Sequence, residues 1–379
     1  MRYQNVVSHV ASRAGLLWAF EQLPSRPGVV VFGYHRIGNR DECEYNRDLF
    51  SASAEQFDYQ LSYIKRHIPV LLPHEFAELM DKKKPITRLH AIITFDDGYL
   101  DNYTVAFPLL RQHNLRAAFF LTTSFVGSSC LPYWDEIAYL VRNTGCPFLP
   151  VPCGSPVTVD LRAGREKAIS QLVEAYKSED NRDSAAFMQQ LRTEAQVQTP
   201  VRRPTPRRHF IDWNEAREMA SADMEIGAHT HTHPILSRLT ECQQQAELQK
   251  AKAVLEQNLG LRVTSLAYPN GGPGDFTAET QRIARDVGFT TAFSYYGGVN
   301  PADGGERFNL LRIAPRAQAQ AFRAELALMS CLGHRNPLNN VRHSNPQHPR
   351  YAVQSQSAQS RFGVLGDQRV VSSERSSTT

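Results

Sequence analysis

Cysteine is scarce in this sequence of 379 residues. The six that occur are scattered and form no C-x-x-C pair: Cys43, Cys130, Cys146, Cys153, Cys242 and Cys331. This pattern excludes a small secreted domain held together by disulfides, and it indicates reduced, structural thiols. Cys146 and Cys153 are close in sequence, but proximity on one loop does not predict a disulfide.

Long hydrophobic runs are also missing. No segment approaches about 18 apolar residues without a charge, so the sequence predicts no membrane-spanning helix. Residues 1–26 have an early arginine, no unbroken apolar core and no A-x-A cleavage site. Their apolar residues recur every three or four positions, which predicts an amphipathic helix packed on its own domain. From these features we expect a cytoplasmic protein.

Neither sign of charge is in excess. The 42 lysines and arginines almost balance the 38 aspartates and glutamates, which leaves a net charge of +4. This balance gives no reason to expect a nucleic acid or a membrane surface as partner, and it favours a neutral or weakly polar substrate. Nothing in the sequence indicates an oligomeric state.

Short apolar runs rich in β-branched and aromatic residues alternate with segments of helical periodicity. Seven such runs predict strands at 29–35, 91–97, 117–123, 224–229, 265–269, 291–295 and 310–313. Between them lie helical patterns such as AEQFDYQLSYIKRH, YTVAFPLLRQHN and AELQKAKAVLEQNLG, and Gly260 is placed to cap the last of these. The alternation predicts a parallel sheet covered on both faces.

An open doubly wound sheet and a β/α barrel both fit this alternation. Polar or aromatic side chains stand at the carboxyl ends of at least four predicted strands, at 34–35, 96–97, 229–233 and 268–269. Groups from many strand ends converge at the rim of a barrel, so the pattern favours a barrel.

Two regions depart from the alternation. Residues 146–208 read as an insertion that is first proline-rich, then helical and charged, and then a basic linker ending in RRPTPRR. Residues 336–379 are poor in apolar side chains, which predicts a disordered tail. The predicted organisation is thus an amphipathic helix at 1–26, a main α/β domain at 27–335 that includes the insertion, and this tail.

The segment AIITFDDGYLDN is an apolar strand that stops at two adjacent carboxylates, Asp96 and Asp97. Two ionised carboxylates at a buried strand end need a cation or a shared proton, because an unpaired buried charge is costly. A metal ion is the simplest cation. The alternative is an ordinary turn, in which Asp96 caps the next helix and Asp97 is solvated.

The segment EIGAHTHTHPILS places His229, His231 and His233 directly after another apolar strand. Neutral imidazole is a preferred ligand of zinc and related divalent metals, and three histidines at alternate positions are hard to explain as core packing. On physical grounds alone, any of the three could be a ligand.

Together these segments make a family resemblance specific. TFDDG at 94–98 and H-T-x-x-H at 229–233 resemble the first two motifs of the polysaccharide deacetylases, the nodulation-type or family-four carbohydrate esterases. GYHRI, DNYTVAFPLLRQHNLRAAFFLTTSFVG and LAYPNG also resemble that family, so the likeness extends over residues 29–313. It implies a distorted (β/α)7 barrel, here with the helical insertion, and hydrolysis of N-acetyl groups on a glycan or sugar.

The resemblance also implies roles for individual residues. Asp97, His229 and His233 would hold a divalent metal, zinc first, with Co²⁺ or Ni²⁺ as alternatives, and Asp96 would be the general base. The family pattern has a variable residue at His231, which gives it a supporting role at most. Such a metal polarises a carbonyl and lowers the pKa of bound water from about 15.7 towards about 7. The resemblance suggests the backbone N–H of Tyr268 as the oxyanion donor.

The sequence departs from the family pattern at two places. The third motif reads AYPNG without an arginine, and the last strand reads LLRIAPR, with Ala314 where a histidine that protonates the amine is expected. The general acid is therefore open: Asp96 could return its proton, or His35 or His231 could act. Arg312 could orient Asp96, or it could form a surface ion pair.

Two other functions remain as alternatives. One is hydrolysis of another non-peptide C–N bond, and the second is a degenerate glycan-binding module without turnover. The general base Asp96 argues against the second, because a binding module needs no base. Several aromatic residues, including Tyr99, Tyr133 and Trp134, are candidates for a surface that stacks on sugars.

Overall fold

The computed structural model describes residues 21, 23–129, 131–178, 183–197 and 208–332. The predicted helix at 1–26 and the predicted tail at 336–379 lie almost entirely outside these residues. Within them no helix is both long and apolar enough to cross a membrane. Cys146 and Cys153 do not form a disulfide with each other.

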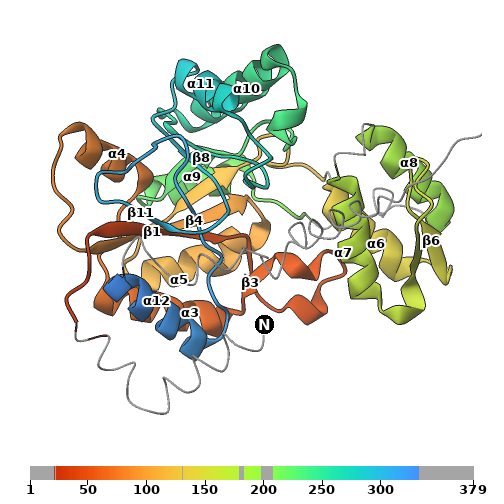
Figure 1. The fold of residues 1–379 in the computed structure, drawn as a ribbon, viewed down its shortest axis with the longest axis horizontal. Coiled ribbons are helices and arrows are strands. Elements are labelled where there is room, and N and C mark those ends of the chain that lie inside the picture. Colours follow the sequence, from red (N-terminus) through yellow and green to blue (C-terminus); the bar gives the residue numbers. More distant parts are fainter. Residues whose placement is uncertain (1–20, 22, 130, 179–182, 198–207, 333–379) are drawn as a thin grey trace, which may run out of the picture.

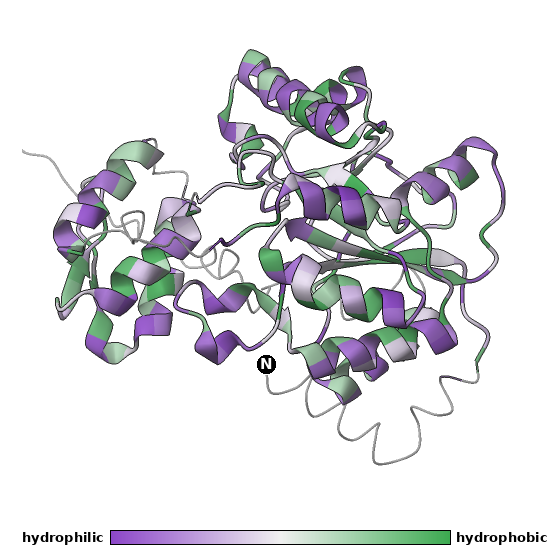
Figure 2. Cartoon of the chain, turned by 180° about the vertical axis from the view of Figure 1, so that it is seen from behind, coloured by the Kyte–Doolittle hydropathy of each residue, from purple (hydrophilic) through white to green (hydrophobic). Residues whose placement is uncertain are grey.

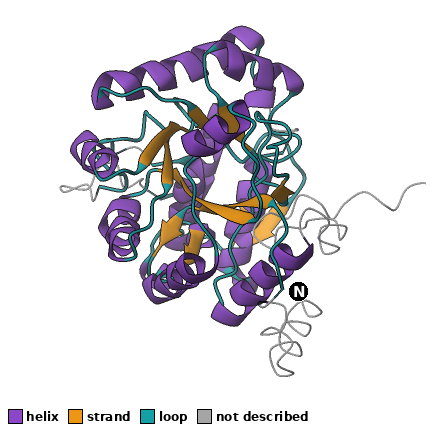
Figure 3. Ribbon diagram, turned by 90° about the vertical axis from the view of Figure 1, so that its left-hand side faces the viewer, coloured by secondary structure: helices purple, strands orange, loops and turns teal. Residues whose placement is uncertain are grey.

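The centre of the molecule is a curled sheet of seven strands in the order β10-β9-β8-β5-β4-β1-β11 (Figure 3). Its strands are β1 (Gly28–Tyr34), β4 (Leu89–Asp97), β5 (Ala118–Leu121), β8 (Glu225–Ala228), β9 (Ser265–Ala267), β10 (Thr291–Phe293) and β11 (Val299–Asn300). All neighbouring pairs are parallel except β1 and β11. This confirms the distorted (β/α)7 barrel class, with six of the seven predicted strands in the sheet.

The seventh predicted strand, at 310–313, is not a regular strand. Leu310 forms an isolated parallel bridge with Phe293 of β10, and Ile313 forms one with Phe32 of β1. Because β10 and β1 lie far apart in the strand order, this segment closes the barrel across the gap between them. It therefore contributes one residue to each neighbour, which is too short a pairing for a regular strand.

Side chains of the strands alternate between two apolar layers. Val29, Val31, Ile92, Phe120 and Phe293 belong to a cluster that includes Leu310 of the closing segment, and this cluster fills the barrel. Residues of opposite parity, such as Val30 and Phe32, pack against the surrounding helices. This two-residue period is the expected property of strands buried on both faces.

Amphipathic helices surround the barrel, with hydrophilic and hydrophobic colours on opposite sides of most of them (Figure 2). They are α3 (Ala54–His67), α4 (Pro73–Asp81), the π-helical turn η3 (Asn102–Ala106) with α5 (Phe107–Gln112), α9 (Trp213–Ser221), α10 (Glu241–Leu259), α11 (Ala278–Asp286) and α12 (Ala319–Leu332). Sequence signals place several ends: Ser53 and Gln56 form a capping box on α3, and Gly260, at φ 68°, ends α10 as predicted.

A second group of elements forms a lobe beside the barrel (Figure 1). We call residues 133–195 the lobe; it consists of α6 (Tyr133–Asn143), β6 (Phe148–Pro150), β7 (Thr158–Asp160), η4 (Leu161–Ala163), α7 (Arg165–Tyr176) and α8 (Ser184–Ala195). Its buried side chains form a hydrophobic cluster of their own, which includes Ile137, Leu172 and Leu191. The lobe therefore takes in α6, which precedes the predicted insertion at 146–208.

Short elements complete the chain: β2 (Arg36–Ile37), η1 (Arg40–Glu42), η2 (Arg47–Leu49), β3 (Phe50–Ala52) and η6 (Leu236–Arg238). The first four form a loop after β1 that reaches the lobe, and η6 follows the histidine segment. Both the loop and η6 form hydrogen bonds with residues of the lobe or next to it.

Candidate metal centre

Strand β4 determines where its two carboxylates point. Asp96 shares the parity of Ile92, a residue of the barrel interior, so its side chain lies on the inner face of the sheet. At Asp97 the backbone turns, with φ 72°, and Gly98 follows with φ 80°. A Cβ on Gly98 would lie 2.9 Å from Leu121, so this turn needs glycine both for its φ and for space. The turn separates the directions of the two adjacent carboxylates.

The histidine segment turns just after β8. Thr230 and His233 have φ values of 63° and 62°, in the left-handed region that β-branched residues rarely adopt. The hydroxyl of Thr230 accepts the backbone N–H of His233 at 3.0 Å, which stabilises the turn. As a result the rings of His229 and His233 lie with their centroids 4.8 Å apart.

Asp97 faces both of these histidines. Its Oδ1 lies 3.5 Å from Nε2 of His229 and 3.4 Å from Nε2 of His233. This oxygen is buried and has no hydrogen-bond partner within the part of the chain that the structure describes. Ligand atoms of the three residues all lie within 4.8 Å of one another. One carboxylate and two imidazoles in this arrangement fit a divalent metal that keeps open positions.

The second nitrogen of His229 supports this assignment. Nδ1 lies 2.8 Å from the carbonyl oxygen of Ala267 at the end of β9. A carbonyl can only accept, so Nδ1 carries the hydrogen and Nε2 presents its lone pair towards Asp97. Strand β9 thus fixes the tautomer of His229 in which Nε2 is available as a metal ligand.

Burial also shifts the pKa values of these groups in the direction a metal site requires. It lowers the pKa of both histidines, that of His233 well below the usual range, where a proton on His229 would also repel a second proton. Both imidazoles are therefore neutral, as ligands must be. Burial and the neighbouring Asp96 raise the pKa of Asp97 well above its usual range. A bound cation would offset that cost.

Asp96 is held ionised by Arg312. Two nitrogens of the guanidinium donate to the two carboxylate oxygens at 2.7 and 2.8 Å. Burial raises the pKa of Asp96, but the charge of Arg312 and its hydrogen bonds outweigh burial, so the net shift is downward. Arg312 is only 1% exposed. It therefore orients Asp96 inside the barrel and does not form a surface ion pair.

The position of Arg312 depends on the barrel around it. Its Nε donates to the carbonyl of Ser294 at 2.9 Å, and its guanidinium lies 5.0 Å from the centre of the Tyr295 ring. The hydroxyl of Tyr295 donates to the carbonyl of Gly33 at 2.6 Å. A Cβ on Gly33 would lie 2.2 Å from the Tyr295 ring, so only glycine leaves room for this contact.

The structure separates the two candidate acids. His35 follows β1, with its ring centroid 5.5 Å from that of Tyr295, and burial lowers its pKa to about 4 while the charge of Asp96 opposes that shift. The Nδ1 atom of His231 lies 2.7 Å from the hydroxyl of Thr123, and His231 does not belong to the group formed by Asp97, His229 and His233. The charge of Asp96 thus acts on His35, whereas His231 is engaged with Thr123.

Tyr268 does not present the donor that the resemblance suggested. Its backbone N–H donates to the carbonyl of Phe293 at 3.0 Å, extending the pairing of β9 with β10, and its hydroxyl donates to the carbonyl of Phe308 at 2.9 Å. Both donors are used within the fold. Two residues later, Asn270 has φ 58° and a buried side-chain nitrogen without a partner among the described residues. Sequence reasoning did not identify Asn270.

Two aromatic residues that were candidates for sugar stacking are buried supports of the centre. The ring of Trp134 lies 4.6 Å from that of His233, centroid to centroid, and its indole N–H donates to the hydroxyl of Tyr99 at 2.7 Å. That hydroxyl donates in turn to Asp135 at 2.6 Å. Tyr99 is 0% and Trp134 5% exposed, so neither can stack on a sugar. One sign of this supporting role is visible in the sequence, because Tyr99 comes directly after the Asp-Asp-Gly turn.

Comparison with known proteins identifies the class to which this fold and site belong. The family model for polysaccharide deacetylase matches residues 83–148 and 164–292, so the chain belongs to the polysaccharide deacetylase family. Its members are hydrolases that act on carbon–nitrogen bonds other than peptide bonds.

Individual relatives are distant. YxkH of Bacillus subtilis, whose name assigns it to the polysaccharide deacetylases, is 20% identical over 82% of this chain and 80% of its own length. The poly-β-1,6-N-acetyl-D-glucosamine N-deacetylase of Staphylococcus epidermidis is 29% identical over 26% of this chain and 38% of its own. The structure of IcaB from Ammonifex degensii has a TM-score of 0.51 and 20% identity, over 80% of this chain and 98% of that one, which supports the fold alone.

Proposed function

We propose that this protein is a metal-dependent deacetylase that removes N-acetyl groups from a polysaccharide, oligosaccharide or sugar intermediate. Asp97, His229 and His233 hold the metal, which we take to be Zn²⁺, and Asp96 is the general base. The observation that carries this proposal is the single buried oxygen of Asp97 facing two imidazole nitrogens, with Asp96 beside it in a bidentate pair with Arg312. The activity for which the Staphylococcus relative is named supports polymers of N-acetylglucosamine as the substrate class.

The metal, when bound, supplies a Lewis acid that polarises the acetamide carbonyl and acidifies water. Asp96 takes the proton of the attacking water, which requires an ionised carboxylate in a fixed direction. Arg312 provides both conditions, because it lowers the pKa of Asp96 and fixes both of its oxygens.

The leaving amine also needs a proton, and we assign its delivery to His35 rather than His231. Burial lowers the pKa of His35 to about 4, so near neutral pH its ring is neutral and lacks the second proton that an acid would give. It must first receive one, and Asp96 is the group that has just gained it. His231 is on the other segment, beside Thr123. We expect His35→Ala to lower kcat more than His231→Ala does, as measured by acetate release.

The test of the base is Asp96→Asn in the full chain. Metal is removed with a chelator and restored with Zn²⁺ or Co²⁺, and acetate release is measured on N-acetylglucosamine oligomers. We expect metal-dependent turnover by the wild type and a fall in kcat of about 10²–10⁴-fold in the variant, because general-base catalysis contributes about that much. Metal content should stay unchanged.

Asp58→Asn is the matched control. Asp58 is a half-exposed carboxylate of α3 paired with His113, away from the centre. It should retain wild-type turnover. Equal turnover in Asp96→Asn and wild type would contradict the assignment of Asp96 as the base. Full turnover without metal would contradict the metal dependence of the reaction. Oligomer binding without turnover would favour a glycan-binding module, while activity only on other amides would favour a different C–N hydrolase.

A further inference from the structure

The lobe contains an open hollow of about 650 Å³, lined by residues of α6, α7 and α8. No ligand of the metal centre lines it. Its polar and aromatic lining comes from Tyr133, Glu136, Tyr176, Ser184, Gln189 and Arg192. The hollow is therefore a second concave surface, separate from the group of Asp97, His229 and His233.

The chemistry of this lining suits an uncharged ligand. Arg192 donates to both oxygens of Glu136, at 2.6 and 2.8 Å, so the two charges in the lining neutralise each other. Ser184 and Gln189 offer hydroxyl and amide groups that can both donate and accept. A phosphate or another strongly charged ligand would need an unbalanced charge, whereas a neutral sugar needs only these hydrogen bonds.

Aromatic rings in the hollow provide an apolar surface. The rings of Tyr133 and Tyr176 are stacked, with centroids 3.7 Å apart and an interplanar angle of 17°. A sugar ring combines apolar C–H faces with a rim of hydroxyls, and tyrosine is a side chain that can contact both. Tyrosines next to neutral hydrogen-bonding groups are therefore a suitable surface for carbohydrate.

A short series of aromatic contacts connects the hollow to the metal centre. The ring of Tyr133 lies 4.8 Å from that of Trp134, and Trp134 lies 4.6 Å from His233, centroid to centroid. In addition, the guanidinium of Arg238 in η6 donates to the carbonyl of Lys177, the residue after Tyr176. Trp134 thus links Tyr133 of the hollow with His233, and Arg238 links the residue next to Tyr176 with η6, which follows the histidine segment.

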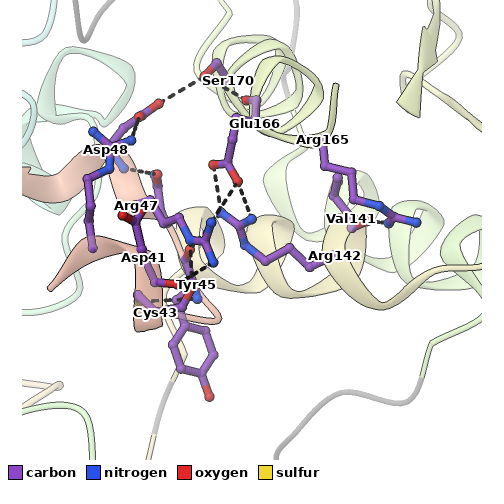
Figure 4. A network of polar contacts seen from close by, with 12 residues as sticks. Asp41, Cys43, Tyr45, Arg47, Asp48, Val141, Arg142, Arg165, Glu166 and Ser170 are labelled. Atoms are coloured by element: carbon purple, nitrogen blue, oxygen red, sulfur yellow. Dashed lines mark hydrogen bonds and ion pairs between the residues drawn. The ribbon is translucent and has the colours of Figure 1, made fainter. Parts of the chain in front are cut away.

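Polar contacts to the loop after β1 hold the lobe in this position (Figure 4). Arg142 of α6 donates to Glu166 of α7 and to the carbonyl of Tyr45, and Ser170 donates to Asp48 at 3.1 Å. Arg47 lies 3.7 Å from Glu166. Because α6 and α7 are both fixed to the barrel loop, the hollow has a defined place relative to the metal centre.

We propose that this hollow binds sugar units flanking the acetylated unit in the metal centre, so that the lobe selects chains of N-acetylated sugars over single sugars. The inference rests on the proposed function for the identity of the substrate. It adds a binding site on the lobe, with the chemistry of a neutral oligosaccharide.

The test is to fill the hollow from an exposed position. Ala186 of α8 lines the hollow and is exposed, so Ala186→Trp should occupy the space without disturbing the core. Thr193→Trp is the matched control, because Thr193 is exposed on the same helix and is not part of the lining. With N-acetylglucosamine oligomers, we expect Ala186→Trp to lower the hexamer-to-dimer ratio of kcat/KM about tenfold, and Thr193→Trp to leave it unchanged. Tyr176→Ala should lower the same ratio.

A binding measurement separates this inference from the proposed reaction. Calorimetric titration of the hexamer into the full-length Asp96→Asn protein should give a Kd about tenfold weaker when Ala186→Trp is added. If the wild type releases no acetate but Ala186→Trp still weakens hexamer binding, the hollow is a glycan-binding site and the proposed reaction is wrong. If the protein does not bind the hexamer, or if the ratio and the Kd are the same in Ala186→Trp and Thr193→Trp, the hollow is not a glycan site.

Discussion

The barrel and the lobe each contain an arginine that forms a two-pronged ion pair with a carboxylate, yet the two pairs have very different surroundings. In the barrel, the side chains of Arg312 and Asp96 are 0% and 3% exposed, whereas in the lobe those of Arg192 and Glu136 are 40% and 9% exposed. A buried pair depends on its partner for all of its stabilisation, while a pair open to water can exchange the partner for solvent. Burial therefore distinguishes the ion pair that positions a reacting group from the one that shapes a surface.

The largest expected effect comes from removing each arginine in turn. Arg312→Met should lower the free energy of unfolding by about 3–5 kcal/mol, because it leaves Asp96 buried and unpaired. Arg192→Met should cost about 1–2 kcal/mol, since water can reach that pair. Urea unfolding of both variants gives the comparison. Adding Asp96→Asn to Arg312→Met should recover part of the loss, and equal losses for the two single variants would contradict the distinction.

A smaller effect of opposite sign is expected at Asp97. Burial, together with the charge of Asp96, raises its pKa in the folded state. A carboxyl group whose pKa is raised by folding makes its full contribution to stability below its pKa in the unfolded chain, about 3.9. This contribution is lost as the pH rises through the pKa of the folded state. Asp97→Asn should therefore stabilise the metal-free protein at neutral pH by about 1–3 kcal/mol, because it removes the buried charge at this position, which has no cationic partner among the described residues.

The same variant should lose the increase in Tm that Zn²⁺ gives to the wild type. Thermal unfolding from pH 4 to pH 8, with and without Zn²⁺, measures both effects. A variant whose Tm still rises on addition of Zn²⁺ as the wild type does would show that Asp97 is not a ligand.

The smallest effect is expected where the lobe meets the barrel loop. The hydrogen bond from Arg142 lowers the pKa of Glu166, but its side chain is 45% exposed, so the pair is well screened. We expect Glu166→Gln to cost no more than about 1 kcal/mol near pH 7. A lowered pKa means that this contribution is present above the unfolded pKa and is lost on acidification through the folded one. Urea unfolding at low and high salt should show a difference only at low salt; a loss as large as that of Arg312→Met would contradict this.

Much of the barrel could be predicted from local sequence. Apolar runs of β-branched residues gave six strands of the sheet, and the Asp-Asp and histidine segments stood at strand ends that the structure brings together. These features are visible because a strand buried on both faces and a polar strand end are both properties of a few consecutive residues. Gly260 is a similar case, since a left-handed helix cap favours glycine.

Features that depend on distant partners could not be predicted. The segment 310–313 looks like a strand, but its two isolated bridges are set by the gap between β10 and β1. Tyr268 stands in a plausible motif, yet the pairing of β9 with β10 uses its N–H. The Arg312–Asp96 pair joins residues that are 216 positions apart in the chain, so the sequence offered it only as one of two alternatives. Local patterns do not record such long-range contacts.

The closing segment has one more consequence. Ile313 bonds to Val31 and Gly33 of β1, and Leu310 bonds to Ala292 and Ser294 around β10, while Arg312 between them holds Asp96. The same few residues thus close the barrel between β10 and β1 and hold Asp96 in place. Local opening generally requires less free energy than complete unfolding. If the closing segment separates from β1 or β10 while the other strands stay paired, the molecule remains folded but Asp96 is no longer aligned. Heat should therefore inactivate this protein at a lower temperature than the one at which it unfolds.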